Sequence, residues 1–326
     1  MATSSSTPAP TAETIRSLQY DLARQKWAFL PAAVTRRLLA DYSETGRPIV
    51  ESTEQSLHAL WDSAVPQQDE HGEAVYPYKG SLVSYYRMDT APGREFNVCR
   101  SSSHDLAGSE VPATSSGEEL PRCVEYIDPT TVSADSKLRA HRQWPISADS
   151  HPCILGLQRV VFELLSGPSD IRWAPAPGTI VEGGTYEPMM TAYRVTKKSK
   201  SSASAAAETG SDSERTYGNA DPGPEGIHQD LAELTVIVLL HRRNLTPESA
   251  GNRVWTLDQP CGKPSKEDVK SFRMLKELVL RERFDTLFVL DREAKHEVLG
   301  IGIGEEGDVA VRDVLTFEVR RPRKEA

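Results

Sequence analysis

The C-terminal half of this 326-residue chain carries a series of short apolar runs rich in β-branched residues. Runs of this kind, separated by Gly, Pro and polar clusters, predict β-strands. They lie at residues 191–195, 234–240, 254–257, 286–290 and 309–319. Short strands that follow one another in this way bury their apolar faces most readily as a sandwich or a barrel.

The N-terminal half is predicted to be mainly helical. After Thr14, apolar residues recur at three- to five-residue steps up to Trp27, which is typical of an amphipathic helix. The same pattern predicts helices at 32–42, 54–63 and 154–165, a strand at 76–88, and one later helix at 266–283. The predicted class is therefore α+β, with a β-sandwich or barrel in the C-terminal half and helices packed outside it.

Composition divides the chain into four segments. Residues 1–11 are rich in Ser, Thr, Pro and Ala and are expected to be a disordered leader. Residues 12–196 hold the helical region and the first strands, and 197–223 form a low-complexity insert. Residues 224–322 are expected to complete the same β-domain.

The net charge of −9 argues against a nucleic-acid or anionic-membrane partner, because phosphate binding needs a basic surface. No apolar run reaches the length of a membrane span, and the N-terminus has no secretory signal. The four Cys residues are scattered, so a disulfide scaffold or structural zinc site is not expected. A cytoplasmic protein is predicted, and its oligomeric state stays open, a homodimer included.

Two motifs resemble functional sites but are discounted. Residues 302–307 spell G-x-G-x-x-G, yet a dinucleotide site needs a strand before this loop and a helix after it. Here the next segment predicts a strand, so a turn between strands is the better interpretation. Cys261 follows Pro260 in a loop without an evident partner base, and it is interpreted as an ordinary thiol.

The motif that carries chemistry is His228-Gln229-Asp230, which ends a loop before the run LTVIVLL. In extended chain, residues i and i+2 point to the same face, so the imidazole and the carboxylate can bind one metal together. A facial triad needs a third ligand, for which His296 is the first candidate and His241 the second. About one H-x-[DE] triplet is expected by chance, and His71-Gly72-Glu73 is interpreted as solvated surface, so hydrogen-bonded structural groups remain the alternative for His228 and Asp230.

Arg312 lies 16 residues after His296 in a predicted strand. An arginine fixed on a strand can bind a carboxylate through its planar fork. In a 2-oxoglutarate enzyme the partner is the distal carboxylate of the co-substrate. The alternative is a surface arginine paired with Asp313 or another nearby acid.

Taken together, PEGIHQD, IVLLHRRN, LFVLDREAKHEV and RDVLTF resemble the 2-oxoglutarate/Fe(II) dioxygenase family typified by bacterial L-isoleucine hydroxylase. The resemblance covers roughly residues 138–320 and extends to fungal members that form an aziridine ring on an amino acid. It implies a double-stranded β-helix (cupin-like jelly roll), with Fe(II), 2-oxoglutarate and O2 as cofactors. It also implies iron ligation by His228, Asp230 and His296 and 2-oxoglutarate binding by Arg312.

The resemblance predicts an enzyme that oxidises an unactivated C–H of a small free aliphatic amino acid, by hydroxylation or ring closure. Tyr193 is the further candidate for cofactor binding. The substrate candidates are Glu225 for the ammonium group, Arg194 or Arg242 for the carboxylate, and Ile227, Leu231 and Phe317 for the side chain. A non-enzymatic jelly-roll binding module is the main alternative, and a zinc hydrolase using the same ligands is a weaker one.

Overall fold

The computed structural model describes residues 10–42, 51–66, 78–90, 95–100, 122–125, 139–145, 148–166, 185–199, 226–230 and 232–320. Its helices are α1 Pro10–Gln25, α2 Ala32–Tyr42, α3 Glu51–Ala59, the 3₁₀ turn η1 Leu60–Ser63, α4 Pro152–Ser166 and α6 Lys266–Val269. The first seven strands are β1 Trp27–Leu30, β2 Val65–Pro66, β3 Lys79–Asp89, β4 Val98–Arg100, β5 Arg122–Glu125, β6 Arg139–Gln143 and β7 Thr185–Lys198. The later strands are β8 Leu234–Arg243, β9 Asn252–Thr256, β10 Met274–Leu278, β11 Thr286–Val289, β12 Ala294–Val298 and β13 Val309–Arg320.

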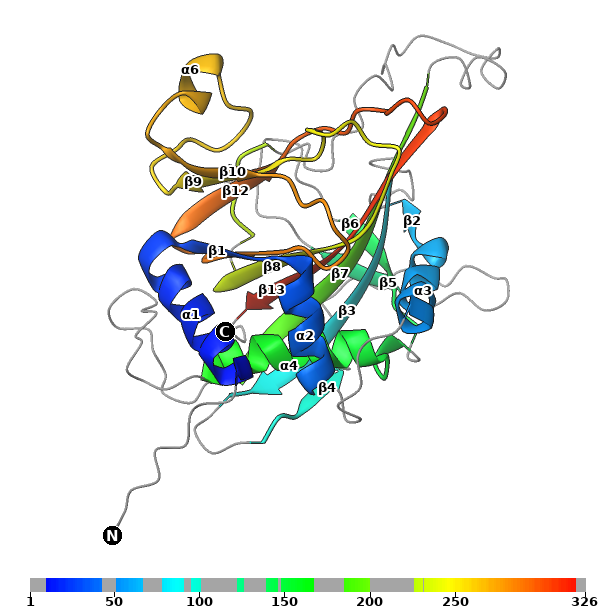
Figure 1. Cartoon of the computed structure of the whole chain (residues 1–326), viewed down its shortest axis with the longest axis vertical. Helices are drawn as coiled ribbons and strands as arrows, with labels where there is room; N and C mark the ends of the chain where they lie inside the picture. The colour runs from blue at the N-terminus through cyan, green and yellow to red at the C-terminus, as the bar shows by residue number, and fades with distance from the viewer. Residues whose placement is uncertain are drawn as a thin grey trace.

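The described strands form two sheets. The large sheet has the order β1-β11-β8-β13-β7-β3-β6-β5, with β2 and β4 also paired to β3, and the small sheet has the order β10-β9-β12. All pairings are antiparallel except β3 with β6. Helices α1, α2 and α4 cover one face of the large sheet, and the small sheet lies toward the opposite face, near α6 (Figure 1). This is the predicted jelly-roll architecture with helices outside it.

Strand alternation divides the core between the two faces of the large sheet. In β8, Leu234, Val236 and Val238 pack in the core beneath the helices, whereas Ile237 and Leu239 pack against the small sheet. Because successive strand side chains point to opposite faces, a strand apolar on both sides must be buried on both. We call these two sides the helix-side face and the triad-side face of the large sheet.

Most predicted elements of the described chain are confirmed. The helices at 32–42, 54–63 and 154–165 and the strands of the C-terminal half lie where the pattern puts them. The first helix starts earlier than expected, at Pro10, and Trp27 lies in β1 rather than in that helix. The loop at 302–307 leads into β13, as the turn interpretation requires.

The predicted helix at 266–283 is wrong. Only Lys266–Val269 is helical, begun by a capping box between Ser265 and Asp268, and Met274–Leu278 is strand β10. Lys, Glu, Leu and Met in this stretch favour a helix by propensity, but pairing with β9 overrides that preference. The strand predicted at 191–195 is also much longer, because β7 pairs with β13 over its length.

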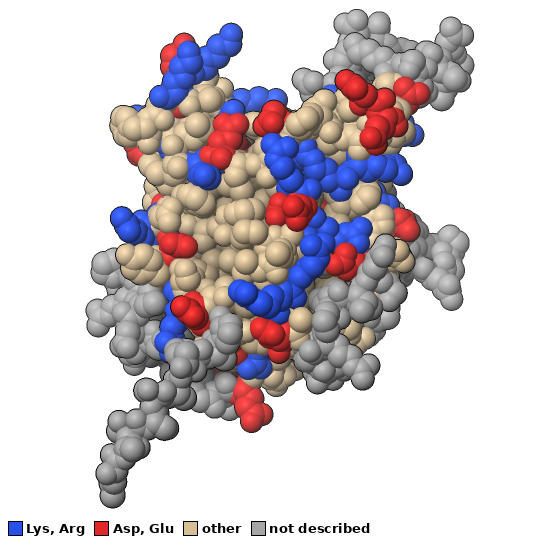
Figure 2. All heavy atoms as spheres, viewed as in Figure 1, with Lys and Arg blue, Asp and Glu red and all other residues tan. Residues whose placement is uncertain are grey.

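Several expectations concern residues outside the described ranges, namely most of the leader and of the 197–223 insert, His71, Glu225 and Leu231. The first two residues of that insert end β7. None of the helices in the described residues is long and apolar enough to span a membrane. On the face drawn in Figure 2, acidic side chains lie among the basic ones.

Candidate metal centre

Two backbone bridges bring the His228 loop to the small sheet. Ile227 exchanges two hydrogen bonds with Gly262, at 2.8 and 2.9 Å, and His228 exchanges two with His296, both at 3.0 Å. Gly226 makes the approach possible, since its φ is 73° and an added Cβ would lie 2.5 Å from the Gly262 oxygen. The loop and β12 are therefore joined through the main chain before any side chain contributes.

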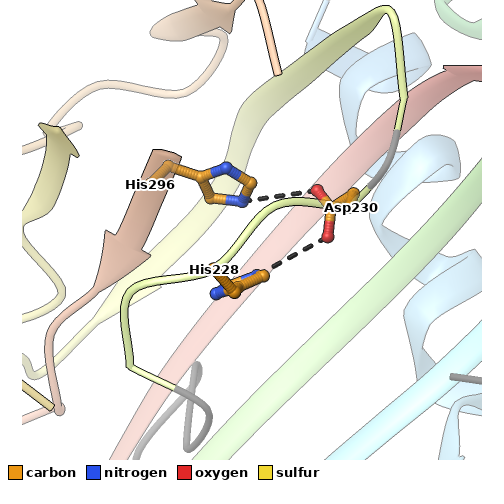
Figure 3. A group of neighbouring side chains, drawn as sticks. All are labelled: His228, Asp230 and His296. Carbon is orange, nitrogen blue, oxygen red and sulfur yellow. Dashed lines mark ion pairs between the residues drawn. The ribbon is translucent and has the colours of Figure 1, made fainter. Parts of the chain in front are cut away.

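His228, Asp230 and His296 each offer a ligand atom, and these atoms lie within 4.8 Å of one another. Asp230 lies between the rings: Oδ1 is 3.5 Å from Nε2 of His228, and Oδ2 is 3.3 Å from Nε2 of His296 (Figure 3). Two imidazole nitrogens and a carboxylate on one side are the donor set of a two-His, one-carboxylate site. We call these three residues the triad.

The other ring nitrogen of each histidine faces an acceptor. Nδ1 of His228 lies 2.8 Å from the carbonyl oxygen of Gly226, and Nδ1 of His296 lies 3.3 Å from Oδ1 of Asp291. A proton on Nδ1 leaves Nε2 with its lone pair available, which is the tautomer a metal requires. Both rings thus present Nε2 toward Asp230, and the triad fits a divalent metal.

Charge around the triad favours ionised Asp230. Burial opposes ionisation, but the imidazoles of His296 and His228 outweigh it and hold the pKa of Asp230 well below its ordinary value. Thr235 on β8 also donates a hydrogen bond of 3.1 Å to Oδ2 of Asp230. The pKa of Asp291 is raised instead, because burial dominates there and Asp230 adds repulsion.

Asp291 is the residue at this site that the sequence interpretation did not single out. Its side chain is fully buried, and its Oδ2 accepts a hydrogen bond of 3.1 Å from the backbone of Ala232. Gln229 also donates from its side chain to the Asp291 carbonyl. Asp291 therefore ties the loop after the triad to the segment that carries His296. In the sequence, its position five residues before His296 is the signal that could have indicated a role beside this ligand.

Arg312 is buried, with 2% exposure, on β13. Within the described part of the chain, its Nη2 atom has no hydrogen-bond partner. Burial, with a contribution from the positive charge of Arg242, lowers the pKa of Arg312 to about 9, so it remains charged at neutral pH. The alternative of a surface arginine paired with Asp313 is wrong, since Asp313 pairs with Arg194 and His58. An anion brought from outside would satisfy Arg312.

Strand alternation separates the other predicted site residues. Tyr193 lies beside the core cluster of the triad-side face, with the Lys79 ammonium 4.4 Å from its ring centre. Arg194, the next residue, lies on the opposite face, where it binds Asp313 and Asp62. Phe317 is buried in the helix-side core. The structure therefore does not bring Arg194 or Phe317 to the triad.

Arg242, Ile227 and His241 also have other surroundings. Arg242 donates to the backbone carbonyls of Thr246, Pro247 and Ser249, which orders that loop. Ile227 is fully buried next to His228. His241 lies against the ring of His58, with a centroid distance of 4.5 Å, and is not part of the triad. Among the described residues, the predicted third ligand His296 alone joins His228 and Asp230 in a possible metal-binding group.

The C-terminal part of the chain is similar to a known protein family. Residues 205–318 match the family model described as 2OG-Fe dioxygenase. The matched residues include His228, Asp230, His296 and Arg312. The predicted enzyme class and the cofactors Fe(II), 2-oxoglutarate and O2 are confirmed with it. No curated protein matches the sequence.

Solved structures share the fold of this chain. The Fe(II)/(alpha)ketoglutarate-dependent dioxygenase TqaL superposes with a TM-score of 0.62 at 15% identity, covering 97% of this chain and 92% of that one. A bsmA homolog from Methylobium petroleophilum PM1 gives 0.62 at 16% identity, with coverages of 96% and 95%. IDO from Bacillus thuringiensis gives 0.57 at 11%, with coverages of 99% and 100%. At these identities the likeness confirms the jelly-roll fold alone.

Proposed function

We propose that this oxygenase oxidises an unactivated C–H bond of a small free aliphatic amino acid, by hydroxylation or by oxidative ring closure to an aziridine. The observation that carries the oxygenase site is the triad, with both histidine Nε2 atoms turned toward the Asp230 carboxylate. Buried Arg312, with Nη2 available to an anion, supports the same site from β13.

In this proposal His228, Asp230 and His296 hold Fe(II), and Arg312 binds the distal carboxylate of 2-oxoglutarate. Bound Fe(II) with 2-oxoglutarate supplies the O2-dependent oxidation of the substrate, with succinate and CO2 as co-products. The Asp291 carboxylate, 3.3 Å from Nδ1 of His296, favours a proton on that nitrogen, and Thr235 donates a hydrogen bond to one oxygen of Asp230. Arg312 neutralises the co-substrate in a buried setting, where a charge-assisted bidentate contact is strong.

The aliphatic substrate rests on the resemblance to L-isoleucine hydroxylase and on the apolar lining of the triad-side face. Val83, Tyr85 and Met189 form a buried cluster there, and Ile237 belongs to the neighbouring cluster between the sheets. Such surroundings favour an aliphatic side chain and distinguish chain lengths only weakly, since one methylene changes binding by about 1–3 kcal/mol. Valine, isoleucine and leucine are therefore expected to react within about a hundredfold of one another.

The test is to load the protein anaerobically with Fe(II) and 2-oxoglutarate, add each amino acid, admit O2, and measure succinate and the amino acid by mass spectrometry. Gain of one oxygen atom identifies hydroxylation, and loss of two hydrogen atoms identifies desaturation or ring closure. Succinate coupled to a changed amino acid supports the proposal. Succinate only with peptides or non-amino acids rejects the substrate, and no succinate under any condition supports the binding-module alternative.

A further inference from the structure

The triad-side face of β13 carries a second set of charged residues, at the end of the strand away from Arg312. Residues 312, 314, 316, 318 and 320 share this face because strand side chains alternate. Val314 packs in the cluster between the sheets, whereas Leu315 and Phe317 pack beneath the helices. Glu318 therefore points to the same side of the sheet as the triad.

Glu318 is linked to Asp230 of the triad through Thr235. It lies opposite Thr235 of β8 in the strand register, and the Thr235 hydroxyl donates to Asp230. Directly opposed residues on one face have Cβ atoms about 5 Å apart. The Glu318 carboxylate thus belongs to the immediate surroundings of Asp230.

Glu318 is buried, with 6% exposure, and forms an ion pair with Arg320, two residues further along the same face. Arg320 lies at the same end of β13 as Glu318 and on the same face of the sheet. A carboxylate and a guanidinium, fixed side by side next to the triad, form a charge pattern complementary to a zwitterion.

Apolar side chains lie beside this pair. On its other side Glu318 is opposite Met189 of β7, which forms a buried cluster with Val83 and Tyr85 of β3. A molecule whose ammonium group met Glu318 would therefore place an adjoining aliphatic chain against apolar surface. The same face combines charge recognition with burial of hydrocarbon.

The charged ends of β13 favour different ligands. Glu318 lies six positions after Arg312, which corresponds to about 20 Å along a strand. Arg312 is flanked by Arg242, its partner in the register, so that end favours a dicarboxylate. At the other end, Glu318 adds a carboxylate to the face that carries Asp230, and an ammonium group complements this negative charge.

We infer that Glu318 and Arg320 form the amino-acid subsite of this enzyme, in which Glu318 receives the substrate ammonium group and Arg320 its carboxylate. This inference rests on the proposed function. It replaces Arg194 and Arg242 as substrate residues, because Arg194 binds acids on the helix-side face and Arg242 binds loop carbonyls. Both residues of the subsite are specificity determinants rather than iron ligands.

The test compares three probes that differ by one charged group: L-valine, 3-methylbutanoate, which lacks the ammonium group, and 2-methylpropylamine, which lacks the carboxylate. Their dissociation constants are measured by anaerobic calorimetry on the protein loaded with Fe(II) and 2-oxoglutarate. Glu318→Gln should raise the dissociation constants of valine and the amine about a hundredfold and leave that of 3-methylbutanoate unchanged. Arg320→Gln should raise the dissociation constants of valine and 3-methylbutanoate and leave that of the amine unchanged.

Glu54→Gln is the matched control. Glu54 is also ion-paired and largely buried, with Arg36 and Arg283, but it belongs to helix α3. This variant should bind all three probes as the wild type does. The affinity for 2-oxoglutarate and the thermal midpoint of each variant verify that the fold and the co-substrate site are intact.

The outcomes separate the inference from the proposed function. If the wild type oxidises valine and Glu318→Gln binds it equally well, the subsite is wrong and the function stands. An equal loss of affinity for all three probes also overturns the subsite, because it indicates a general change in the structure of the site rather than the loss of one charged contact. If the wild type converts 2-oxoglutarate but binds neither valine nor the amine, both the subsite and the amino-acid substrate are rejected, while the oxygenase remains.

Discussion

Arg194 and Arg312 lie on neighbouring strands, one register position apart, yet their side chains have opposite surroundings. Arg194 on the helix-side face binds both oxygens of fully buried Asp313 and also binds Asp62, and these bonds raise its pKa. Arg312 on the triad-side face has an Nη2 atom without a hydrogen-bond partner in the described chain, and its pKa is lowered. Among the described residues, acids pair with Arg194, whereas no acid pairs with Arg312.

For these two arginines, the presence or absence of an acidic partner distinguishes a structural charge from a binding charge. A buried cation costs free energy unless an anion compensates it. On the helix-side face the compensation is internal and stabilises the sheet. On the triad-side face the cost remains in the unliganded protein and is offset when a carboxylate binds. The two faces should therefore respond differently to the same kind of substitution.

The largest expected contrast is between histidines of the two faces. His296→Ala should abolish iron binding and succinate formation while the fold persists, because its ring is a ligand rather than a packing element of the helix-side core. His58→Ala is the control, since its Nε2 atom lies 2.9 Å from Asp313 on the helix-side face. It should retain full iron content by elemental analysis. Wild-type activity in His296→Ala would remove His296 from the triad.

Exchanging the two arginines for alanine should separate binding from stability. Arg312→Ala should raise the KM for 2-oxoglutarate about a hundredfold, with little loss of stability, because a charge-assisted contact to the ligand is lost. Arg194→Ala should cost a few kcal/mol of unfolding free energy, roughly 3, because buried Asp313 loses its bidentate partner and keeps only His58, and should leave that KM unchanged. Steady-state kinetics and denaturant unfolding measure the two effects. An unchanged KM in Arg312→Ala would reject its co-substrate role.

A smaller effect is expected for Asp291→Ala. Loss of the carboxylate behind His296 should weaken Co(II) binding about ten- to a hundredfold in anaerobic calorimetry, because the tautomer and orientation of the ring are no longer fixed. Asp285→Ala is the matched control: Asp285 is also buried and accepts backbone hydrogen bonds, from Ala32, Arg281 and Glu282. It should lose stability but keep its Co(II) affinity. Equal metal affinities for the two variants would make Asp291 a purely structural acid.

The smallest effect is expected from deleting residues 200–220, part of the low-complexity insert. Loop closure depends weakly on loop length, so iron binding and the thermal midpoint should be nearly unchanged. Thermal unfolding and iron titration of the shortened chain measure this. A large loss of amino-acid affinity with intact iron binding would instead show that the insert contributes to substrate binding.

The sequence by itself determined much of the secondary structure and the residue types of the site. Short apolar runs rich in β-branched residues located the main strands of the C-terminal half. The spacing of His228 and Asp230 indicated a metal site, and the family resemblance added His296, Arg312 and 2-oxoglutarate. These signals are local, because strand propensity and the i, i+2 geometry of His228 and Asp230 depend on neighbouring residues only. The folded chain then brings the three predicted ligands together.

Only the tertiary structure decided which face each residue occupies and which residues surround the triad. Alternation shows that Arg312 and Asp313 point to opposite sides, but helix packing and the small sheet decide which side is which. Glu318 reaches the neighbourhood of Asp230 through Thr235, by a strand pairing that no local pattern encodes. Pairing with β9 likewise converted the predicted helix at 266–283 into β10. Non-local contacts carry enough free energy to override propensities of a few tenths of a kcal/mol per residue, which is why these features could be read from the fold alone.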